Sequence, residues 1–287
     1  MKVTKVVLPV AGWGTRSLPA SKNIPKEMLP IFNKPVIQYV VEEAVRAGIQ
    51  EVIFVTNRHK SVVTDHFDRN IELEELLADA EKMEQLKAVQ DVANMVEVMA
   101  VRQKQQLGLG HAVGCATSMV QGDYFAVMVG DDFMVGDDAG LVQLVKTAEK
   151  YNMPAIGVME VPADKIDKYG MVAGEEIEDG VYKITDMVEK PAVGSMDSRL
   201  AIVGRYVLPT EIFSYIKNVK PGKGGEIQLT DAMYNYMKDK GMLAVKMKGR
   251  RFDAGDWVDY LTAGVYFGLK DKKISEALRN SLKQVLG

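Results

Sequence analysis

The chain has 287 residues, with 39 acids against 36 bases and a formal net charge of −3, a balance that does not favour nucleic acid as a partner. Its single cysteine, Cys115, excludes an internal disulfide. No apolar run approaches the roughly 18 residues of a membrane span, and the apolar start of the chain is too short for a signal peptide. We therefore expect a cytoplasmic protein without a membrane partner.

An apolar strand, expected over residues 5–10, leads straight into a glycine loop. Gly12 and Gly14 would let backbone N–H groups approach phosphate oxygens that a Cβ would obstruct, and Thr15 adds a hydroxyl. The loop lacks the Gly-Lys-Ser/Thr end of a Walker A motif, and Ser17 stands where a dinucleotide fingerprint needs its third glycine. The loop therefore predicts a phosphate site of another kind.

Two cations belong to the same loop. Arg16 and Lys26 suit a polyphosphate, and residues 1–34 carry a single acid, Glu27. Four prolines keep the chain irregular until Val36. A bare strand-to-helix turn would need neither cation, so this stretch indicates a site for a nucleoside triphosphate.

Strand and helix patterns alternate along the first half of the chain, which favours a largely parallel sheet. A helix is expected from Val36 until Gly48, which is a typical C-terminal stop, and a longer amphipathic helix is expected over residues 71–93. Further strands are expected over residues 51–56, 96–101, 124–130 and 155–161.

The second half has shorter β segments, which we interpret as a second, smaller lobe of one domain. Its strands are expected over residues 170–173, 181–188 and 201–208, and its helices over residues 229–240 and 258–269. A final amphipathic helix, over residues 272–287, could pack against the chain itself or against another subunit. The lobes are expected at residues 1–136 and 137–270, followed by a C-terminal segment at residues 271–287.

A second glycine cluster follows the strand expected to end at residue 101. Gln103 has an amide that offers a donor and an acceptor to a nucleobase edge, and Gly108 admits a flat ring against the backbone. Taken alone, the pattern is equally that of a glycine-rich turn with a surface glutamine. Beside the phosphate loop, it favours a base-reading site.

Acidic residues stand at the end of the strand expected over residues 124–130, and open α/β sheets bind ligands at the carboxyl ends of their strands. Asp131 is a candidate Mg²⁺ ligand, because one or two carboxylates plus substrate phosphates hold such a cation. Asp253, far along the chain, is the candidate second ligand. Capping of the next turn is the alternative role, and Asp132 is interpreted as such a cap or as a supporting residue.

A last cluster combines an acid with a base. Glu189 can accept hydrogen bonds from sugar hydroxyls, and Lys190 can pair with a phosphate. Gly170 and residues 202–206 accompany them. In isolation, Glu189 and Lys190 would be an ordinary surface ion pair. Residues 225–232 are a further signal, although Thr230 or Asp231 could simply cap the helix that begins there.

In this order, the motifs resemble those of the sugar-nucleotide nucleotidyltransferase (pyrophosphorylase) family over nearly the whole chain, most closely its uridylyltransferase branch. The matching segments are residues 11–16, 25–30, 37–40, 102–112, 201–206 and 226–232. The resemblance implies an α/β fold with a Rossmann-like, mixed but mostly parallel central sheet flanked by helices, and a smaller lobe that binds the sugar.

The resemblance also implies a role for each matching residue. The nucleotide would be held by Ala11, Gly12, Gly14 and Thr15, with its phosphates on Arg16 and Lys26. The pyrimidine would be read by Gln103 and Gly108. The sugar pocket would be lined by Gly170, Glu189, Ile202 and Gly204, with the phosphate of the sugar 1-phosphate on Lys190. Mg²⁺ would be coordinated by Asp131 and Asp253.

Several positions depart from the family pattern without removing a charged group. Trp13 replaces a smaller apolar residue, Ser17 and Asn23 are also atypical, and Gly130 stands where a proline often precedes the aspartates. These departures leave base and sugar selectivity open.

The reaction that the resemblance implies is Mg²⁺-dependent transfer of UMP from UTP to glucose 1-phosphate, giving UDP-glucose and pyrophosphate, by a homodimer or homotetramer. Use of dTTP or of another hexose 1-phosphate is an alternative, because one methyl group is worth only about 1–3 kcal/mol in a fitted pocket. A catalytically silent regulatory subunit is a further alternative. Such a protein would be expected to lose one of its charged site residues, whereas Arg16, Lys26, Asp131 and Asp253 are all present.

Overall fold

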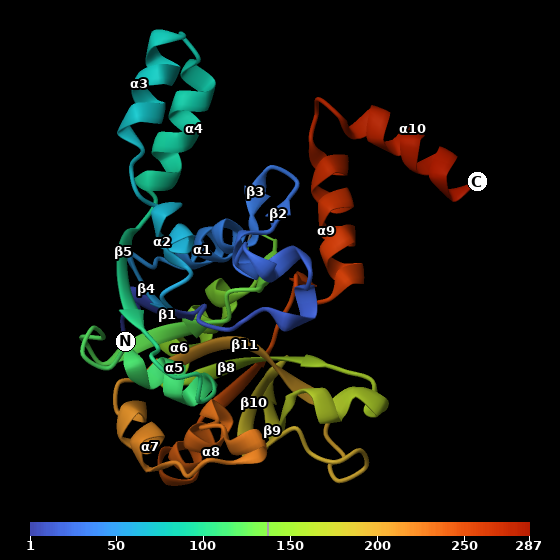
Figure 1. Cartoon of the computed structure of the whole chain (residues 1–287). Coiled ribbons are helices and arrows are strands. Elements are labelled where there is room, and N and C mark those ends of the chain that lie inside the picture. The colour runs from blue at the N-terminus through green and yellow to red at the C-terminus, as the bar shows by residue number, and fades with distance from the viewer. Residues whose placement is uncertain (137) are drawn as a thin grey trace.

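The computed structural model describes residues 1–136 and 138–287. The expected boundary between the lobes falls at Asp137, outside the described residues. The strands of the main sheet are β1 (Lys5–Pro9), β4 (Glu51–Thr56), β5 (Glu97–Arg102), β6 (Tyr124–Met128), β8 (Ala155–Glu160), β9 (Gly170–Glu178), β10 (Val181–Glu189), β11 (Leu200–Pro209) and β12 (Leu243–Lys246). Their order across the sheet is β5-β4-β1-β6-β11-β8-β12-β10-β9 (Figure 1). Strands from both expected lobes thus share one sheet.

Helices lie on both faces of this sheet, and others extend away from it (Figure 1). They are α1 (Val36–Arg46), α2 (Ser61–Asp65), α3 (Ile71–Asp79), α4 (Met83–Ala93), α5 (Leu109–Cys115), α6 (Leu141–Tyr151), α7 (Ile212–Asn218), α8 (Leu229–Lys240), α9 (Trp257–Lys270) and α10 (Ser275–Leu286). Over the described part of the chain, none of them is long and apolar enough to cross a membrane.

The sheet is mixed, so the expectation of a mostly parallel, Rossmann-like sheet is correct only in part. β1 pairs in parallel with β4 and β6, β4 with β5, and β8 with β12. β11 runs antiparallel to β6 and β8, and β10 runs antiparallel to β9 and β12. One cause is the turn at Asp179-Gly180, where Gly180 has a φ of 73°. A tight Asp-Gly turn joins successive strands as a hairpin, which is necessarily antiparallel.

The side chains of β1 point alternately into two hydrophobic cores, which places this strand inside the fold. Val6 and Leu8 join one hydrophobic core, to which α1 and α6 also contribute, whereas Val7 joins a second core with α5, α7 and α8. Successive side chains of a strand point to opposite faces. A strand buried on both faces is therefore continuously apolar in sequence, and the prediction of this strand is confirmed.

The single helix expected over residues 71–93 is wrong, because the chain turns back between α3 and α4. The two helices form a hairpin that projects from the body of the molecule (Figure 1). Glu81 adopts a left-handed φ of 54° at the turn, and Gln90 of α4 donates to Glu74 of α3 at 3.0 Å. Apolar residues keep a helical spacing across the turn, so periodicity alone gives no sign of the break.

A small antiparallel pair, not expected from the sequence, joins β7 (Asp132–Val135) to β13 (Arg250–Asp253). Asp253 lies opposite Asp132 in this ladder, and the N–H of Ala254 donates to the Asp131 carbonyl at 2.8 Å. The two candidate metal ligands, far apart in sequence, therefore meet at one end of this pair.

Candidate active site

A cavity of about 330 Å³ lies beyond the carboxyl end of β6. The candidate residues that line it are Arg16, Asp131, Asp253, Gly170, Glu189, Lys190, Ile202 and Gly204. Residues predicted separately for a phosphate, a metal and a sugar are thus brought together around one space.

The glycine loop above this cavity is fixed by its first carbonyl. The Ala11 oxygen accepts from Asn57 Nδ2 at 2.8 Å and from Gln106 Nε2 at 2.7 Å. Because the peptide is planar and trans, the N–H of Gly12 points away from those two amides. Within the described part of the chain, the N–H groups of Gly12 and Gly14 donate to no protein acceptor. They are therefore available to an anion such as a phosphate.

The cations of the loop converge on one carboxylate. Thr15 and Arg16 belong to a short 3₁₀ turn, η1 (Thr15–Ser17), and Arg16 Nη2 lies 3.7 Å from Asp131 Oδ2. Lys26 donates to the same carboxylate oxygen. Burial raises the pKa of Asp131, but Lys26 and then Arg16 outweigh that effect and hold the pKa below its ordinary value. Asp131 is therefore ionised, as a ligand of a cation must be.

A buried ion network behind the cavity was missed by the sequence reasoning. Arg205 is fully buried and donates to Glu43 at 2.8 and 3.0 Å and to Asp132 at 3.1 Å. Asp132 also accepts from Arg251, which in turn lies 3.3 Å from Asp253. Asp132 is thus a supporting residue rather than a helix cap. A local signal for Arg251 was present in the sequence. Arg251 stands two residues before the candidate ligand Asp253, and residues two apart on a strand share a face.

The sugar side of the cavity is built from the ends of β9 and β10. Gly170 and Glu189 lie opposite each other in the ladder. A Cβ on Gly170 would come within 2.9 Å of the Glu189 carboxylate and 3.0 Å of the Ile202 side chain. Thr230, for which helix capping was the alternative role, donates to Glu189 at 2.7 Å, and Lys190 Nζ lies 3.5 Å from the same carboxylate. Only a glycine leaves this carboxylate in place.

Gly204 in β11 is required because the strand packs closely against Val129 at this position. Gly204 has a φ of 68°, and a Cβ there would meet the Val129 side chain at 2.5 Å. The N–H of Val129 donates to the Gly204 carbonyl at 3.0 Å. β11 is thereby held against the segment that carries Asp131.

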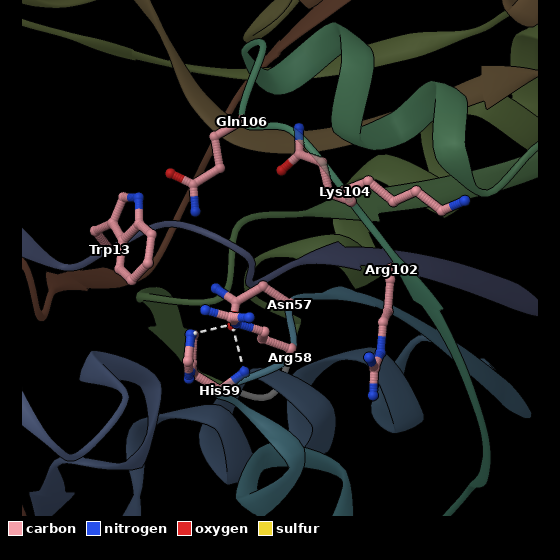
Figure 2. Close-up of a pocket in the computed structure, with 8 residues that line it drawn as sticks. Trp13, Asn57, Arg58, His59, Arg102, Lys104 and Gln106 are labelled. Atoms are coloured by element: carbon pink, nitrogen blue, oxygen red, sulfur yellow. Dashed lines mark hydrogen bonds between the residues drawn. The ribbon is translucent and has the colours of Figure 1, made fainter.

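The candidate base-reading residues lie beside a second cavity of about 430 Å³ (Figure 2). Gln103 lines it, and its Nε2 lies 3.2 Å from the Gly108 carbonyl and 3.0 Å from His111 Nδ1. Gly108 has a φ of 99°, and a Cβ there would come within 2.8 Å of the Ile227 carbonyl. Gln103 therefore borders a different space from the sugar residues, and the glycine loop lies near both.

Comparisons with known proteins show which family the chain resembles over most of its length. Residues 5–267 match a family model described as nucleotidyl transferase. The chain is 43% identical over 277 residues to the UTP–glucose-1-phosphate uridylyltransferase of Bacillus subtilis, covering 96% of this chain and 95% of that one. A solved structure of UTP-bound UGPase from Acinetobacter baumannii is 40% identical, with a TM-score of 0.89, covering 98% of this chain and 99% of that one. A UDP-glucose pyrophosphorylase complexed with UDP-glucose is 39% identical, with a TM-score of 0.85, covering 94% and 100%.

Proposed function

The chain belongs to the nucleotidyl transferase family, and on that premise we propose that it is a UTP–glucose-1-phosphate uridylyltransferase, which transfers UMP from UTP to glucose 1-phosphate and releases pyrophosphate. The observation that carries the proposal is the cavity where a nucleotide loop, two aspartates and the pair Glu189 and Lys190 meet. The named relatives, similar over nearly the whole chain, support the same substrates.

The reaction is an in-line attack by a phosphate oxygen of glucose 1-phosphate on the α-phosphorus of UTP. The attacking oxygen is already anionic, so the chain need supply neither a general base nor a covalent nucleophile. Its task is to align two polyanions that repel each other in water. Lys190 would hold the sugar phosphate, while Arg16 and Lys26 would hold the triphosphate and stabilise the charge on the departing pyrophosphate.

We also propose that Asp131 and Asp253 hold Mg²⁺. Both line the cavity, and the ion pairs with Lys26 and Arg16 favour the ionised form of Asp131. The described residues contain no cluster of three or more metal-ligating side chains, and Mg²⁺ typically completes a small set of carboxylates with substrate phosphates and water. When bound, the ion would neutralise charge on the triphosphate and polarise the reacting phosphate.

The substrates are tested by measuring pyrophosphate release with Mg²⁺, crossing UTP and dTTP against glucose, galactose and N-acetylglucosamine 1-phosphates. Turnover confined to UTP with glucose 1-phosphate is expected. Faster turnover with dTTP or with another sugar phosphate would favour the alternative transferases. Tight binding of UDP-glucose without release from any pair would favour a silent regulatory subunit.

A homodimer or homotetramer working in the cytoplasm is a further part of this proposal. α10 contains no buried residue, and Val285 and Leu286 at its end are 79% and 83% exposed. An apolar helix face left in water favours a contact with another protein surface. Sedimentation of the full chain should give a multiple of the 31.7 kDa chain mass, and a monomer at assay concentration would contradict the proposal.

A further inference from the structure

Trp13 lines the second cavity and has been given no role so far. Trp13 stands on the glycine loop and is 64% exposed. Its nearest aromatic neighbour is His59, with 6.1 Å between ring centroids and a tilt of 39°. Figure 2 shows the indole at one end of the cavity, with Arg102 and Lys104 toward the other end. A large apolar ring therefore borders an open space and is largely exposed to water.

The backbone that carries this indole is held in place. The Ala11 carbonyl, two residues before Trp13, accepts hydrogen bonds from Asn57 and Gln106, and both amides also line the cavity. The side chain thus projects from an anchored loop at the edge of the cavity. Such a position suits a fixed stacking surface better than a mobile surface residue.

The charge of the cavity favours an anionic ligand. Arg58, Arg102 and Lys104 line it, and no acidic residue does. Among the described residues, none of these three cations forms an ion pair with a carboxylate. A nucleotide combines a flat ring with negative charge, and both features match this lining.

Gln103 supplies the hydrogen-bonding edge of the same cavity. Its Nε2 already faces the Gly108 carbonyl and the ring of His111. No buried side-chain polar atom of the described residues lacks a partner, and no described residue donates to the Oε1 of Gln103, so this oxygen is accessible to solvent. A carbonyl acceptor suits the ring N–H that uracil and thymine share.

We propose that Trp13 stacks on the pyrimidine ring of the nucleoside triphosphate whose edge Gln103 reads. This inference rests on the proposed function and assigns a residue that sets nucleotide affinity. Stacking tolerates any base because every base has a π face, whereas a hydrogen bond to Gln103 depends on the pattern of donors and acceptors. Trp13 therefore strengthens binding of UTP and dTTP alike and leaves discrimination between bases to Gln103.

Fluorescence gives a direct test, because Trp13 and Trp257 are the two tryptophans of the chain. In Trp257→Phe, Trp13 is the sole indole, and UTP should quench its emission with a midpoint near the KM for UTP. The matched variant Trp13→Phe keeps only Trp257, and its emission should change little. Unchanged Trp13 emission at saturating UTP would overturn the proposal.

Kinetics give a second, independent test. Trp13→Leu should raise the KM for UTP and for dTTP by a similar factor, roughly five- to hundredfold, with kcat little changed. Trp13→Phe should retain most of the affinity because it keeps a ring. An unchanged KM, or an effect on one nucleotide alone, would overturn the proposal. If the wild-type chain released no pyrophosphate, the proposed function would fail, but quenching of Trp13 by UTP would still decide this inference.

Discussion

At the scale of single residues, the two aspartates of the cavity carry the sharpest prediction. Asp131→Asn and Asp253→Asn should each lower kcat by about 10²–10³ or more, because each removes a carboxylate proposed to hold Mg²⁺ beside the reacting phosphates. The measurement is pyrophosphate release across a range of Mg²⁺ concentrations. Asp256→Asn is the matched control, since that carboxylate caps α9 through the N–H groups of Val258 and Asp259. Near-normal turnover of Asp131→Asn at saturating Mg²⁺ would refute the metal assignment.

Arg205 carries a prediction about stability rather than chemistry. It is fully buried between Glu43 and Asp132, so Arg205→Leu would leave the buried Glu43 without its cation and Asp132 with Arg251 alone. Breaking a buried pair from one side typically costs about 3–5 kcal/mol, and we expect a loss of that size in the free energy of unfolding in denaturant. Arg199→Leu, a change of the same kind at an exposed position, should cost little. Equal effects of the two substitutions would contradict this role.

The site residues show what a sequence can and cannot predict at this scale. Asp131 is recognisable because a charged group follows an apolar strand, Lys190 because it stands beside an acid at the end of a β segment, and Gly108 because a glycine marks a close approach. Glu43 and Arg205 give no such signal, since one lies in an amphipathic helix and the other in a buried strand. Their pairing depends on packing between segments distant in sequence, which no local pattern records.

At the scale of elements, the hairpin of α3 and α4 has a pH dependence that can be predicted. Hydrogen bonds from Arg69, and then from Gln90, lower the pKa of Glu74 to about 2 from its ordinary value of 4.5. A carboxylate with a lowered folded-state pKa stabilises the fold above the ordinary value, and that contribution is lost as the pH falls toward the folded value. Glu74→Gln should therefore lower the Tm at neutral pH, and the difference from wild type should shrink below pH 4.5.

Glu75→Gln is the control for that measurement, because Glu75 is the exposed neighbour on the same helix. It should leave the Tm nearly unchanged at every pH. A deficit of Glu74→Gln that stays constant as the pH falls through 4.5 would show that the stabilisation does not come from the carboxylate charge.

Elements were predictable where one local signal decides them. α8 was placed at its observed bounds, and the strands of residues 51–56 and 124–130 were close to β4 and β6, because apolar runs and helical periodicity mark them. The break between α3 and α4 preserves that periodicity, and β7 with β13 is too short to stand out. A three-residue turn and a four-residue ladder are decided by tertiary contacts, so these were the elements that sequence reasoning missed.

At the scale of the whole molecule, the two expected lobes are joined by the middle of the sheet. β6 from the first half pairs with β11 from the second, with Ala126 opposite Val207, and one hydrophobic core contains both Val6 and Val245. Separating the lobes would expose two strand edges and open that core. We therefore expect the chain to lose its structure in one transition rather than lobe by lobe.

Denaturant unfolding followed by tryptophan emission and by far-UV circular dichroism tests this expectation. The two probes should give coincident curves, since a single cooperative unit has one midpoint for every probe. UTP present at about 100 times its Kd should stabilise the whole transition by about 2.7 kcal/mol, because only the folded chain binds it. If UTP shifted one of the two curves and not the other, the chain would not be unfolding as a single unit. The ladder between β6 and β11 would then be too weak to make the two lobes one cooperative unit.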